Sequence, residues 1–540
     1  MIERELKLHV PQAARAPIAK ALRAQKARRT SLHACYYDTA TRELAHARIA
    51  LRLRKEGRHW VQTVKAPGAD ALTRIEVNHV RPGPTLDLQL YDGTPLQGLL
   101  AALEHPLLPR YETKVTRLVL QATLDGSVVE VAYDQGIVLA GGLELPISEV
   151  EFELVSGDIA SVFDLGEQWL ERYGLILDLR SKAERGDALA AFAFKPEGAS
   201  ASAEAQANAA AGLWPARRAK TPALKGKTGI AAAYQLCANE CLSQIIQNTA
   251  YIAGVDTALA GKAAHVEYVH QARVGIRRLR SCWKLFKHHV EPAEAAAEAQ
   301  LRRGFGLFGG SRDADIIQLT VEPQLIDAGL PAYQPSRAQP EPHARPETVA
   351  AGAPLQSALL RLLRQLVVLG EPANTPTAAD ANKAKLIAAQ LDGIEAGAPV
   401  RATSDSRSDD APALRPVLTK RLNGWLKKIA KAGSEFTSLP IDKQHDVRKE
   451  VKSLRYCLDF AEHLLAKPEL RPLRSSLAQI QAVLGDLNDY YVAEGYYRPL
   501  VQAQPQLWFA VGWLRAAQDH RKTLAQVLFR KLDEHKPLKK

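Results

Sequence analysis

The sequence lacks long apolar runs, a secretory leader pattern and more than a few cysteines. No uninterrupted apolar stretch approaches the roughly 20 residues that a membrane-spanning helix needs, and the first residues lack the basic-then-apolar order of a signal peptide. Five cysteines in 540 residues are too few for a disulfide framework. Cys237 and Cys241 lie one helical turn apart, and we expect them to be small core residues, with metal ligands as the alternative. These absences argue against membrane-spanning proteins and disulfide-rich secreted scaffolds, and they favour a cytoplasmic protein.

The excess of basic residues is confined to the second part of the chain. The formal net charge is +12, but residues 1–195 contain 25 Lys and Arg against 25 Asp and Glu. The remaining residues therefore contain 46 basic and 34 acidic side chains. A neutral first part followed by a basic second part indicates two different roles, the second of which we expect to involve a polyanion.

Charged residues take alternate positions in many of the short runs between residues 1 and 194. Because alternate side chains of a strand share a face, Glu3, Glu5 and Lys7 lie together on one side of an extended "MIERELKLHV". Similar charged faces occur at Arg52 and Arg54, Lys65, Glu130 and Asp134, and Glu149, Glu151 and Glu153. An antiparallel sheet with one solvated face is the simpler interpretation. A sheet that closes into a barrel would instead enclose a lumen with an acidic and a basic side.

A lumen of this kind suits a metal-bound polyphosphate. Carboxylates that lie close together repel one another and take up protons unless a divalent cation lies among them. Hard oxygen ligands suit Mg²⁺ or Mn²⁺, and Arg and Lys side chains bind phosphoryl oxygens. The alternating pattern therefore favours phosphate chemistry inside the barrel.

The first part resembles the CYTH superfamily, also called triphosphate tunnel metalloenzymes, over about residues 1–195. The resemblance rests on the E-x-E-x-K opening, "LRLR", "TVK", "EVEFEL" and "SKAERG", which follow one another in the family's order. It implies hydrolysis of inorganic triphosphate to pyrophosphate and phosphate, with Mg²⁺ or Mn²⁺ as cofactor. The catalytic residues that it implies are Glu3, Glu5, Lys7, Glu149 and Glu151. The metal ligands that it implies are Glu3, Glu5, Asp134, Glu149, Glu151 and Glu153. The triphosphate-binding residues that it implies are Lys7, Arg52, Arg54, Lys65, Arg117 and Lys182. The alternative interpretation of Arg117 and Lys182 is that they are ordinary charged residues on the protein surface.

A basic segment occurs twice in the second part, 175 residues apart. "HQARVGIRRLRSCWKLF" begins at His270, and "HDVRKEVKSLRYCLDF" begins at His445. Helical spacing places one stripe of each copy on a single face: His270, Arg273, Arg277 and Arg280, and His445, Arg448, Lys452 and Arg455. Like charges on neighbouring turns repel, so an anionic partner is expected, although a solvated face is the alternative. We expect the second copy to be less basic, because Ser453 replaces Arg278.

These segments resemble the CHAD domain, a helical domain of two related bundles, over about residues 225–540. The resemblance implies that inorganic polyphosphate binds along a basic channel formed by the two stripes. A buried histidine without phosphate contact is the alternative for His270 and His445. Nucleic acid is not expected, because the stripes lack interleaved aromatic residues for base stacking and no recognised nucleic-acid-binding module occurs.

The sequence therefore predicts an α+β multidomain protein. An N-terminal antiparallel β-barrel, or tunnel, occupies residues 1–195, a linker follows over 196–229, and an all-α domain of two related helical bundles covers 230–540. Two polar, Pro-rich tracts at about 322–354 and 395–416 are expected to be loops or disordered insertions.

The expected function is a cytoplasmic metal-dependent inorganic triphosphatase, associated with polyphosphate granules, with a polyphosphate-binding helical domain. Its expected partners are inorganic triphosphate and polyphosphate, with no membrane. One alternative is a polyphosphate-binding protein without catalysis. The other is a CYTH enzyme that acts on nucleoside or thiamine triphosphates.

Overall fold

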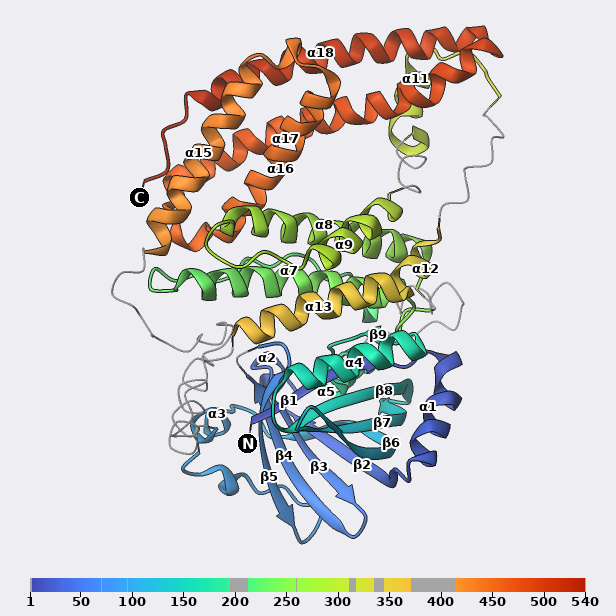
Figure 1. Ribbon diagram of the computed structural model, residues 1–540, viewed down its shortest axis with the longest axis vertical. Coiled ribbons are helices and arrows are strands. Elements are labelled where there is room, and N and C mark those ends of the chain that lie inside the picture. The colour runs from blue at the N-terminus through green and yellow to red at the C-terminus, as the bar shows by residue number, and fades with distance from the viewer. Residues whose placement is uncertain are drawn as a thin grey trace.

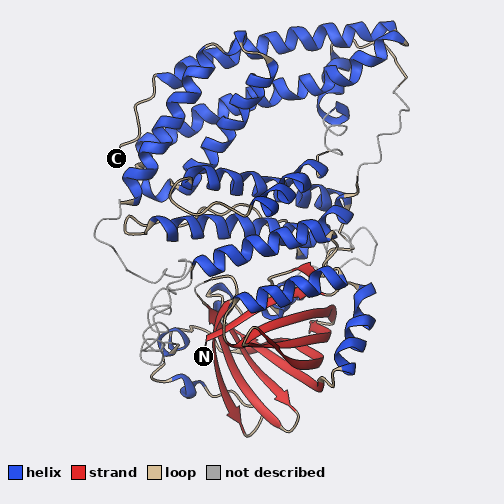
Figure 2. Ribbon diagram, in the orientation of Figure 1, coloured by secondary structure: helices blue, strands red, loops and turns tan. Residues whose placement is uncertain are grey.

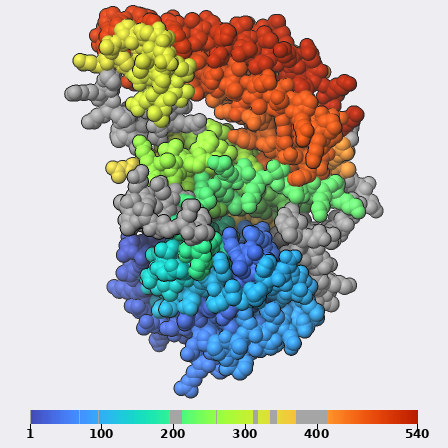
Figure 3. Space-filling view, turned by 180° about the vertical axis from the view of Figure 1, so that it is seen from behind, coloured from blue at the N-terminus to red at the C-terminus, as the bar shows by residue number. Residues whose placement is uncertain are grey.

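The chain forms an N-terminal β-barrel and a C-terminal helical domain, which are stacked along the long axis of the molecule (Figures 1 and 2). The computed structural model describes residues 2–68, 70–94, 96–194, 212–258, 260–309, 317–334, 344–370 and 413–539. Seen from behind in Figure 3, the barrel residues are blue to cyan, the green helices lie above them, and the C-terminal helices are orange and red at the top. The predicted fold class is confirmed.

Eight antiparallel strands close the barrel. Their order is β5-β4-β3-β2-β6-β7-β8-β1, and pairing of β5 with β1 closes the ring, while the short β9 pairs with β1 outside it. The strands are β1 (Ile2–His9), β2 (Arg28–Asp38), β3 (Ala50–Glu56), β4 (His59–Pro67), β5 (Thr73–Arg81), β6 (Leu108–Leu124), β7 (Ser127–Ala140), β8 (Leu143–Ser156) and β9 (Ile176–Leu177). The alternation predicted for residues 1–194 is therefore the pleat of a closed sheet.

The barrel has its hydrophobic core on the outside of its wall. Leu6 and Leu8 of β1 and Phe152 of β8 are fully buried, and α4 (Ala160–Tyr173) packs over these strands. A Cβ on Gly166 would lie 2.5 Å from Leu6 Cδ2, so a larger residue there would displace the end of that leucine side chain. Helix α1 (Gln12–Ala24) packs on β6, and two short helices, α2 (Glu43–His46) and α3 (Gln97–Ala101), connect strands. Because helices cover the apolar outer face of the barrel wall, the charged face of the wall points into the lumen.

Helix α5 (Lys182–Ala193) packs across the barrel strands β6, β7 and β8. It begins with a capping box, in which the Ser181 hydroxyl accepts from the Glu184 N–H and the Glu184 carboxylate accepts from the Ser181 N–H. Gly186 faces Tyr111, whose ring carbon would lie 2.2 Å from an added Cβ. The "SKAERG" segment thus fixes where this helix starts and how closely it approaches the barrel.

The helical domain contains a lower and an upper group of helices (Figure 1). The lower helices are α7 (Ile230–Ile252), α8 (Lys262–Phe286), α9 (Ala295–Leu307), α12 (Pro346–Ala351) and α13 (Ala353–Leu369). The upper helices are α11 (Glu322–Asp327), α15 (Leu414–Ser434), α16 (Ile441–Phe460), α17 (Lys467–Tyr497) and α18 (Trp508–Asp533). Over the described parts of the chain, no helix combines the length and apolar character needed to cross a membrane.

The two domains share a packed interface. Figure 1 shows α13 lying between the barrel and the other helices, and it packs directly on α4. Arg364 pairs with Asp164 at 2.5 Å, and the Leu177 N–H of β9 donates to Gln356 Oε1 of α13 at 2.8 Å. One cluster of buried apolar side chains runs from the barrel wall through this interface into the helices. The barrel and the helical domain are therefore held as one packed body.

The structure corrects the expectation of a loop over residues 322–354 in part, because α11 and α12 form within that tract and Ala350 is fully buried. Residues 328–334 are not helical, and residues 335–343 lie outside the described part of the chain. Both helices have only six residues, too few for a helical period to be read from sequence. Residues 395–412 of the second tract lie outside the described residues, and α15 begins at Leu414. In the described part of the expected linker, Trp214 and Leu224 are buried, and the Trp214 carbonyl accepts from the Tyr268 hydroxyl at 2.8 Å.

Candidate functional site

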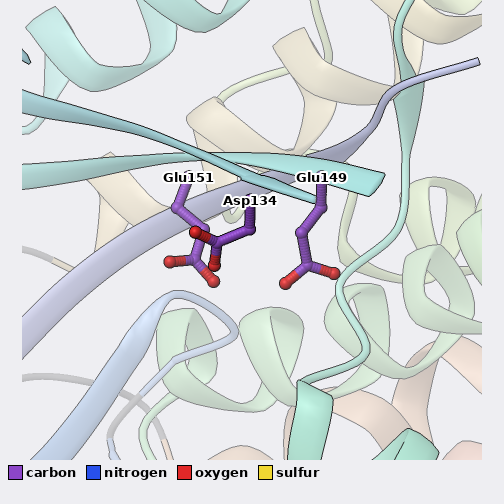
Figure 4. A group of neighbouring side chains, drawn as sticks. All are labelled: Asp134, Glu149 and Glu151. Carbon is purple, nitrogen blue, oxygen red and sulfur yellow. The ribbon is translucent and has the colours of Figure 1, made fainter. Parts of the chain in front are cut away.

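Three carboxylates converge on one place in the barrel wall. Asp134 lies on β7 opposite Glu149 of β8, and Glu151 follows two residues later on β8. All three are buried, and each offers an oxygen within 4.8 Å of the others. Figure 4 shows them projecting from the same side of the two strands. Among the described residues, no other group of three acidic, His or Cys side chains converges in this way.

Basic side chains from three other elements surround this acidic group. The Lys182 ammonium of α5 lies 2.6 Å from Asp134, 2.5 Å from Glu149 and 2.7 Å from Glu151. Arg117 of β6 donates to Asp134 at 2.7 Å and to Glu151 at 2.5 Å, and Lys7 of β1 lies 3.1 Å from Glu151. The predicted residues Lys7, Arg117 and Lys182 are thus brought to the acidic group, and Arg117 and Lys182 are not ordinary surface charges.

The surrounding cations lower the pKa values of Asp134 and Glu151. Burial opposes the charged form of Glu151, but Lys182, Lys7 and Arg117 hold its pKa well below the usual range. Burial likewise opposes the charge of Asp134, yet Lys182 and Arg117 lower its pKa. Burial would lower the pKa of Lys182, but its three carboxylate neighbours raise it. Asp134 and Glu151 are therefore held as carboxylates, and ammonium and guanidinium groups balance their charge.

The acidic group fits a hard divalent cation. The Lys182 ammonium shows that one cationic centre reaches all three carboxylates from a single position. Carboxylate oxygens are the ligands that Mg²⁺ and Mn²⁺ prefer. Asp134, Glu149 and Glu151 are accordingly the residues that would hold a metal ion. Glu3, Glu5 and Glu153 lie outside this group, and their metal-binding role remains a prediction.

A second cluster lies where β1 meets β4 and β5. Lys65 contacts Glu3 at 2.7 Å and Glu76 at 2.8 Å, and Arg52 lies 3.8 Å from Glu76. Burial raises the pKa of Glu3 to about 8, with Lys65 opposing the rise. Here the positive charge of Lys65 is shared between two close carboxylates.

Residues of both clusters line one cavity of about 450 Å³ inside the barrel, although Glu149 is not among the lining residues. Its lining includes Glu5, which pairs with Lys7 at 2.9 Å, and Arg54, which pairs with Glu56. Glu153 also lines it, and burial together with the charge of Glu5 raises the pKa of Glu153 to about 7. The other predicted residues that line the cavity are Glu3, Lys7, Arg52, Lys65, Arg117, Asp134, Glu151 and Lys182. The barrel therefore places predicted acidic and basic residues around a single space.

Two buried residues next to the site were missed by the sequence reasoning. Arg185 donates to Glu149 at 3.3 Å, and Asp256, which follows α7 in the helical domain, pairs with Arg185 at 2.8 Å. Arg185 follows Lys182 by three residues on α5, so helical spacing was a usable signal for it. No local pattern distinguishes Asp256, because it meets the barrel only through tertiary packing.

The duplicated segments form α8 and α16, which pack against each other. The Cys457 thiol contacts the Ser281 carbonyl at 3.4 Å, so the two helices meet at nearly equivalent positions of the repeat. Arg273 and Arg277 lie over the ring of Phe305, 4.4 and 5.0 Å from its centroid. All eight residues of the predicted stripes, namely His270, Arg273, Arg277, Arg280, His445, Arg448, Lys452 and Arg455, are half-buried. Their proposed contact with polyphosphate remains a prediction.

Arg278 does not belong to the exposed basic face. Its side chain is 2% exposed and donates to Gln244 Oε1 and to the Lys220 carbonyl, each at 2.7 Å. It also lies over the Phe460 ring of α16, 5.3 Å from the centroid. The second copy has one cation fewer at this position, but Ser453 replaces a buried packing residue and not a member of the half-buried stripe.

Replacing Arg278 by Ala is expected to lower the free energy of unfolding by about 3 kcal/mol, because Gln244 and the Lys220 carbonyl lose buried hydrogen bonds and a cavity forms. Urea denaturation followed by circular dichroism measures this change. Arg218→Ala is the control, since that side chain is 80% exposed and its loss should cost a small fraction as much. Equal destabilisation by the two variants would contradict the packing role of Arg278.

Two family descriptions match the chain, the CYTH domain over residues 1–186 and the CHAD domain over residues 238–498. The chain therefore contains a CYTH domain followed by a CHAD domain. A relative from Haemophilus influenzae, an inorganic triphosphatase, is 33% identical over 157 residues. That stretch is 28% of this chain and 44% of the relative, so the similarity spans less than half of the relative's length.

Solved structures also align with each of the two domains. The CHAD domain from the plant Ricinus communis is 22% identical with a TM-score of 0.39, and the alignment covers 60% of this chain and 98% of that one. A candidate adenylyl cyclase from Hippeastrum, described as having a dominant triphosphatase activity, is 18% identical with a TM-score of 0.24. That alignment covers 35% of this chain and 95% of the Hippeastrum chain.

Proposed function

We propose that the barrel is a divalent-cation-dependent inorganic triphosphatase that converts triphosphate and water to pyrophosphate and phosphate. The observation that carries this proposal is the single cavity in which a buried carboxylate group and several Arg and Lys side chains face the same space. The similarity of the barrel sequence to an inorganic triphosphatase supports the same substrate class. Mg²⁺ and Mn²⁺ are the proposed cofactors, because all the donors are carboxylate oxygens.

The side chains of the cavity supply the parts that phosphoryl transfer needs. Arg52, Arg54 and Lys65 bind phosphoryl oxygens from the β3 and β4 side of the cavity, and Arg117 and Lys182 do so from the β6 and α5 side. Water attacks the terminal phosphorus of triphosphate, and the bond between that phosphorus and its bridging oxygen breaks. Pyrophosphate leaves, and the attacking water loses a proton. A bound metal ion would neutralise phosphate charge next to the carboxylates. The protein's own contribution is to hold the triphosphate in line with the attacking water and to balance the negative charge of the triphosphate.

The helical domain is proposed to bind inorganic polyphosphate along the stripes of α8 and α16. The support for this role is the pairing of two basic, half-buried stripes on helices that pack together. A packed interface between the domains keeps such a binding site near the barrel, which raises the local concentration of short phosphate chains.

Phosphate release from inorganic triphosphate, ATP, thiamine triphosphate and long-chain polyphosphate, each with Mg²⁺, Mn²⁺ or EDTA, tests the proposed reaction. We expect the highest rate with triphosphate and none with EDTA. Glu5→Gln should lower that rate by about 10²-fold, because Glu5 balances the charge of Lys7 in the cavity.

Glu171→Gln, an exposed change on α4, is the matched control and should leave the rate unchanged. Higher rates with ATP or thiamine triphosphate would favour an enzyme for those substrates. No release from any substrate would leave polyphosphate binding without catalysis as the function.

A further inference from the structure

A carboxylate of the helical domain reaches two arginines of the barrel domain. Asp256 follows α7, and it accepts two hydrogen bonds from Arg185, at 2.9 Å from Nε and 2.8 Å from Nη2. Arg180 donates to the same carboxylate at 3.0 Å. The exposed fractions of the three side chains are 5%, 3% and 8% for Asp256, Arg185 and Arg180. This contact is therefore a buried, bidentate ion pair between the two domains. Two parallel hydrogen bonds restrict the geometry of such a pair more than one hydrogen bond does.

Arg185 connects this ion pair to the acidic group of the barrel. Its Nη1 donates to Glu149 Oε2 at 3.3 Å, and its Nη2 donates to the Pro146 carbonyl of the same strand at 2.6 Å. The other carboxylate oxygen of Glu149 accepts from Lys182 at 2.5 Å. Glu149 is thus held between Lys182 on one side and an arginine anchored by the helical domain on the other.

The loop that carries Asp256 is itself fixed. Asp256 has a φ of +64°, in the left-handed region, which aspartate adopts more readily than most residues other than glycine. The next residue, Thr257, is buried and its hydroxyl donates to the Tyr251 carbonyl, while Val255 packs against Ile176 of β9. A loop that is packed and hydrogen-bonded directly at the ion pair indicates that the position of this carboxylate is determined by the fold.

We propose that Asp256 is a positioning residue for the barrel. It acts through Arg185 to set the orientation of the Glu149 carboxylate and how much of its negative charge is available to a metal ion. The helical domain would thereby complete the metal-binding group of the other domain. This inference rests on the proposed function for the metal-binding role of Glu149. When Asp256 loses its charge, the buried Arg185 retains Glu149 as its carboxylate partner, so Glu149 is drawn toward the guanidinium and away from a metal ion.

Mn²⁺ binding to the full-length protein without substrate tests the proposal, by calorimetry or by loss of the free-Mn²⁺ EPR signal. Asp256→Asn is expected to weaken Mn²⁺ binding by about tenfold or more, the range found when a residue that orients a metal ligand is lost. Asp256→Glu, which keeps the charge, should recover part of the affinity.

Two controls disturb the same interface without reaching Glu149. Asp164→Asn removes the charge that pairs with Arg364, and Gln356→Met removes the buried hydrogen bond to Leu177. Both should leave Mn²⁺ affinity within about twofold of wild type. An equal loss in Asp256→Asn and either control would assign the effect to a loosened interface and overturn the proposal.

A double-mutant cycle with Arg185→Gln separates positioning from general destabilisation. Because Asp256 acts through Arg185, the double variant Asp256→Asn/Arg185→Gln should bind Mn²⁺ as Arg185→Gln alone does. Removal of both charges also preserves charge balance if Asp256→Asn alone does not fold. Additive losses of affinity would overturn the proposal. A wild-type protein that binds Mn²⁺ but releases no phosphate would refute the proposed function and leave this inference standing.

Discussion

Replacing Glu151 by Gln is expected to reduce phosphate release from triphosphate by about 10³-fold, the largest effect that we predict for a single substitution. Glu151 belongs to the three-carboxylate group and contacts Lys7, Arg117 and Lys182 at 3.1, 2.5 and 2.7 Å. The amide keeps the shape of the side chain but removes a metal-binding charge. It also leaves three buried cations with less opposing charge, so the rate measurement is made per folded protein, as determined by near-UV circular dichroism.

Glu144→Gln is the matched control for this variant. Glu144 lies on the same strand, β8, but it is exposed and does not line the cavity. We expect its rate to equal that of wild type. A folded Glu151→Gln protein that retains metal-dependent turnover would remove the acidic group of β7 and β8 from the mechanism. It would direct attention to Glu3 and Glu5 on the neighbouring strand, β1.

Replacing Arg273 and Arg448 together by Gln is expected to weaken binding of long-chain polyphosphate by about tenfold or more. The two residues occupy equivalent positions of α8 and α16, and both are half-buried, so each can contact a long polyanion that follows the two helices. Each phosphate contact releases bound counterions, so the slope of log affinity against log salt should fall by roughly two when two such contacts are lost. Fluorescence anisotropy with labelled polyphosphate at several salt concentrations measures affinity and slope.

Loss of net charge alone would also weaken binding of a polyanion, so the control removes the same charge from the same two helices. Lys262→Gln with Lys449→Gln takes one cation from α8 and one from α16 at exposed positions. These changes should alter affinity only slightly and leave the salt slope within about half a unit. Identical behaviour of the two double variants would show that binding follows overall charge and not the stripes.

The strands and their charged faces were predictable because a β-strand has a local period of two. Glu3, Glu5 and Lys7 alternate with apolar residues that the barrel buries under helices, so the same alternation that predicted the strand also predicted its lumen face. The repeated segments were predictable for a similar reason, since matching residues 175 positions apart require no knowledge of folding. The helices α11 and α12 were missed because six residues carry too little periodicity.

The sequence was a weaker guide to which side of a helix faces the core. Arg278 lies next to Arg277 in a basic segment, yet one side chain is buried against Gln244 and the other is half-exposed over Phe305. Composition alone treats the two as equivalent cations. Packing distinguishes them, because a long side chain with a guanidinium group can be buried when its donors find carbonyl partners.

The sequence by itself determined the two-domain organisation, the antiparallel barrel with charges on one face of its strands, and the duplicated basic helix. Each of these depends on local periodicity or on internal repetition. The tertiary structure alone decided that Asp134, Glu149 and Glu151 converge on Lys182, and that Asp256 meets Arg185 from 71 residues away. Such contacts depend on barrel closure and domain packing, and these bring together side chains whose separation along the chain carries no local signal.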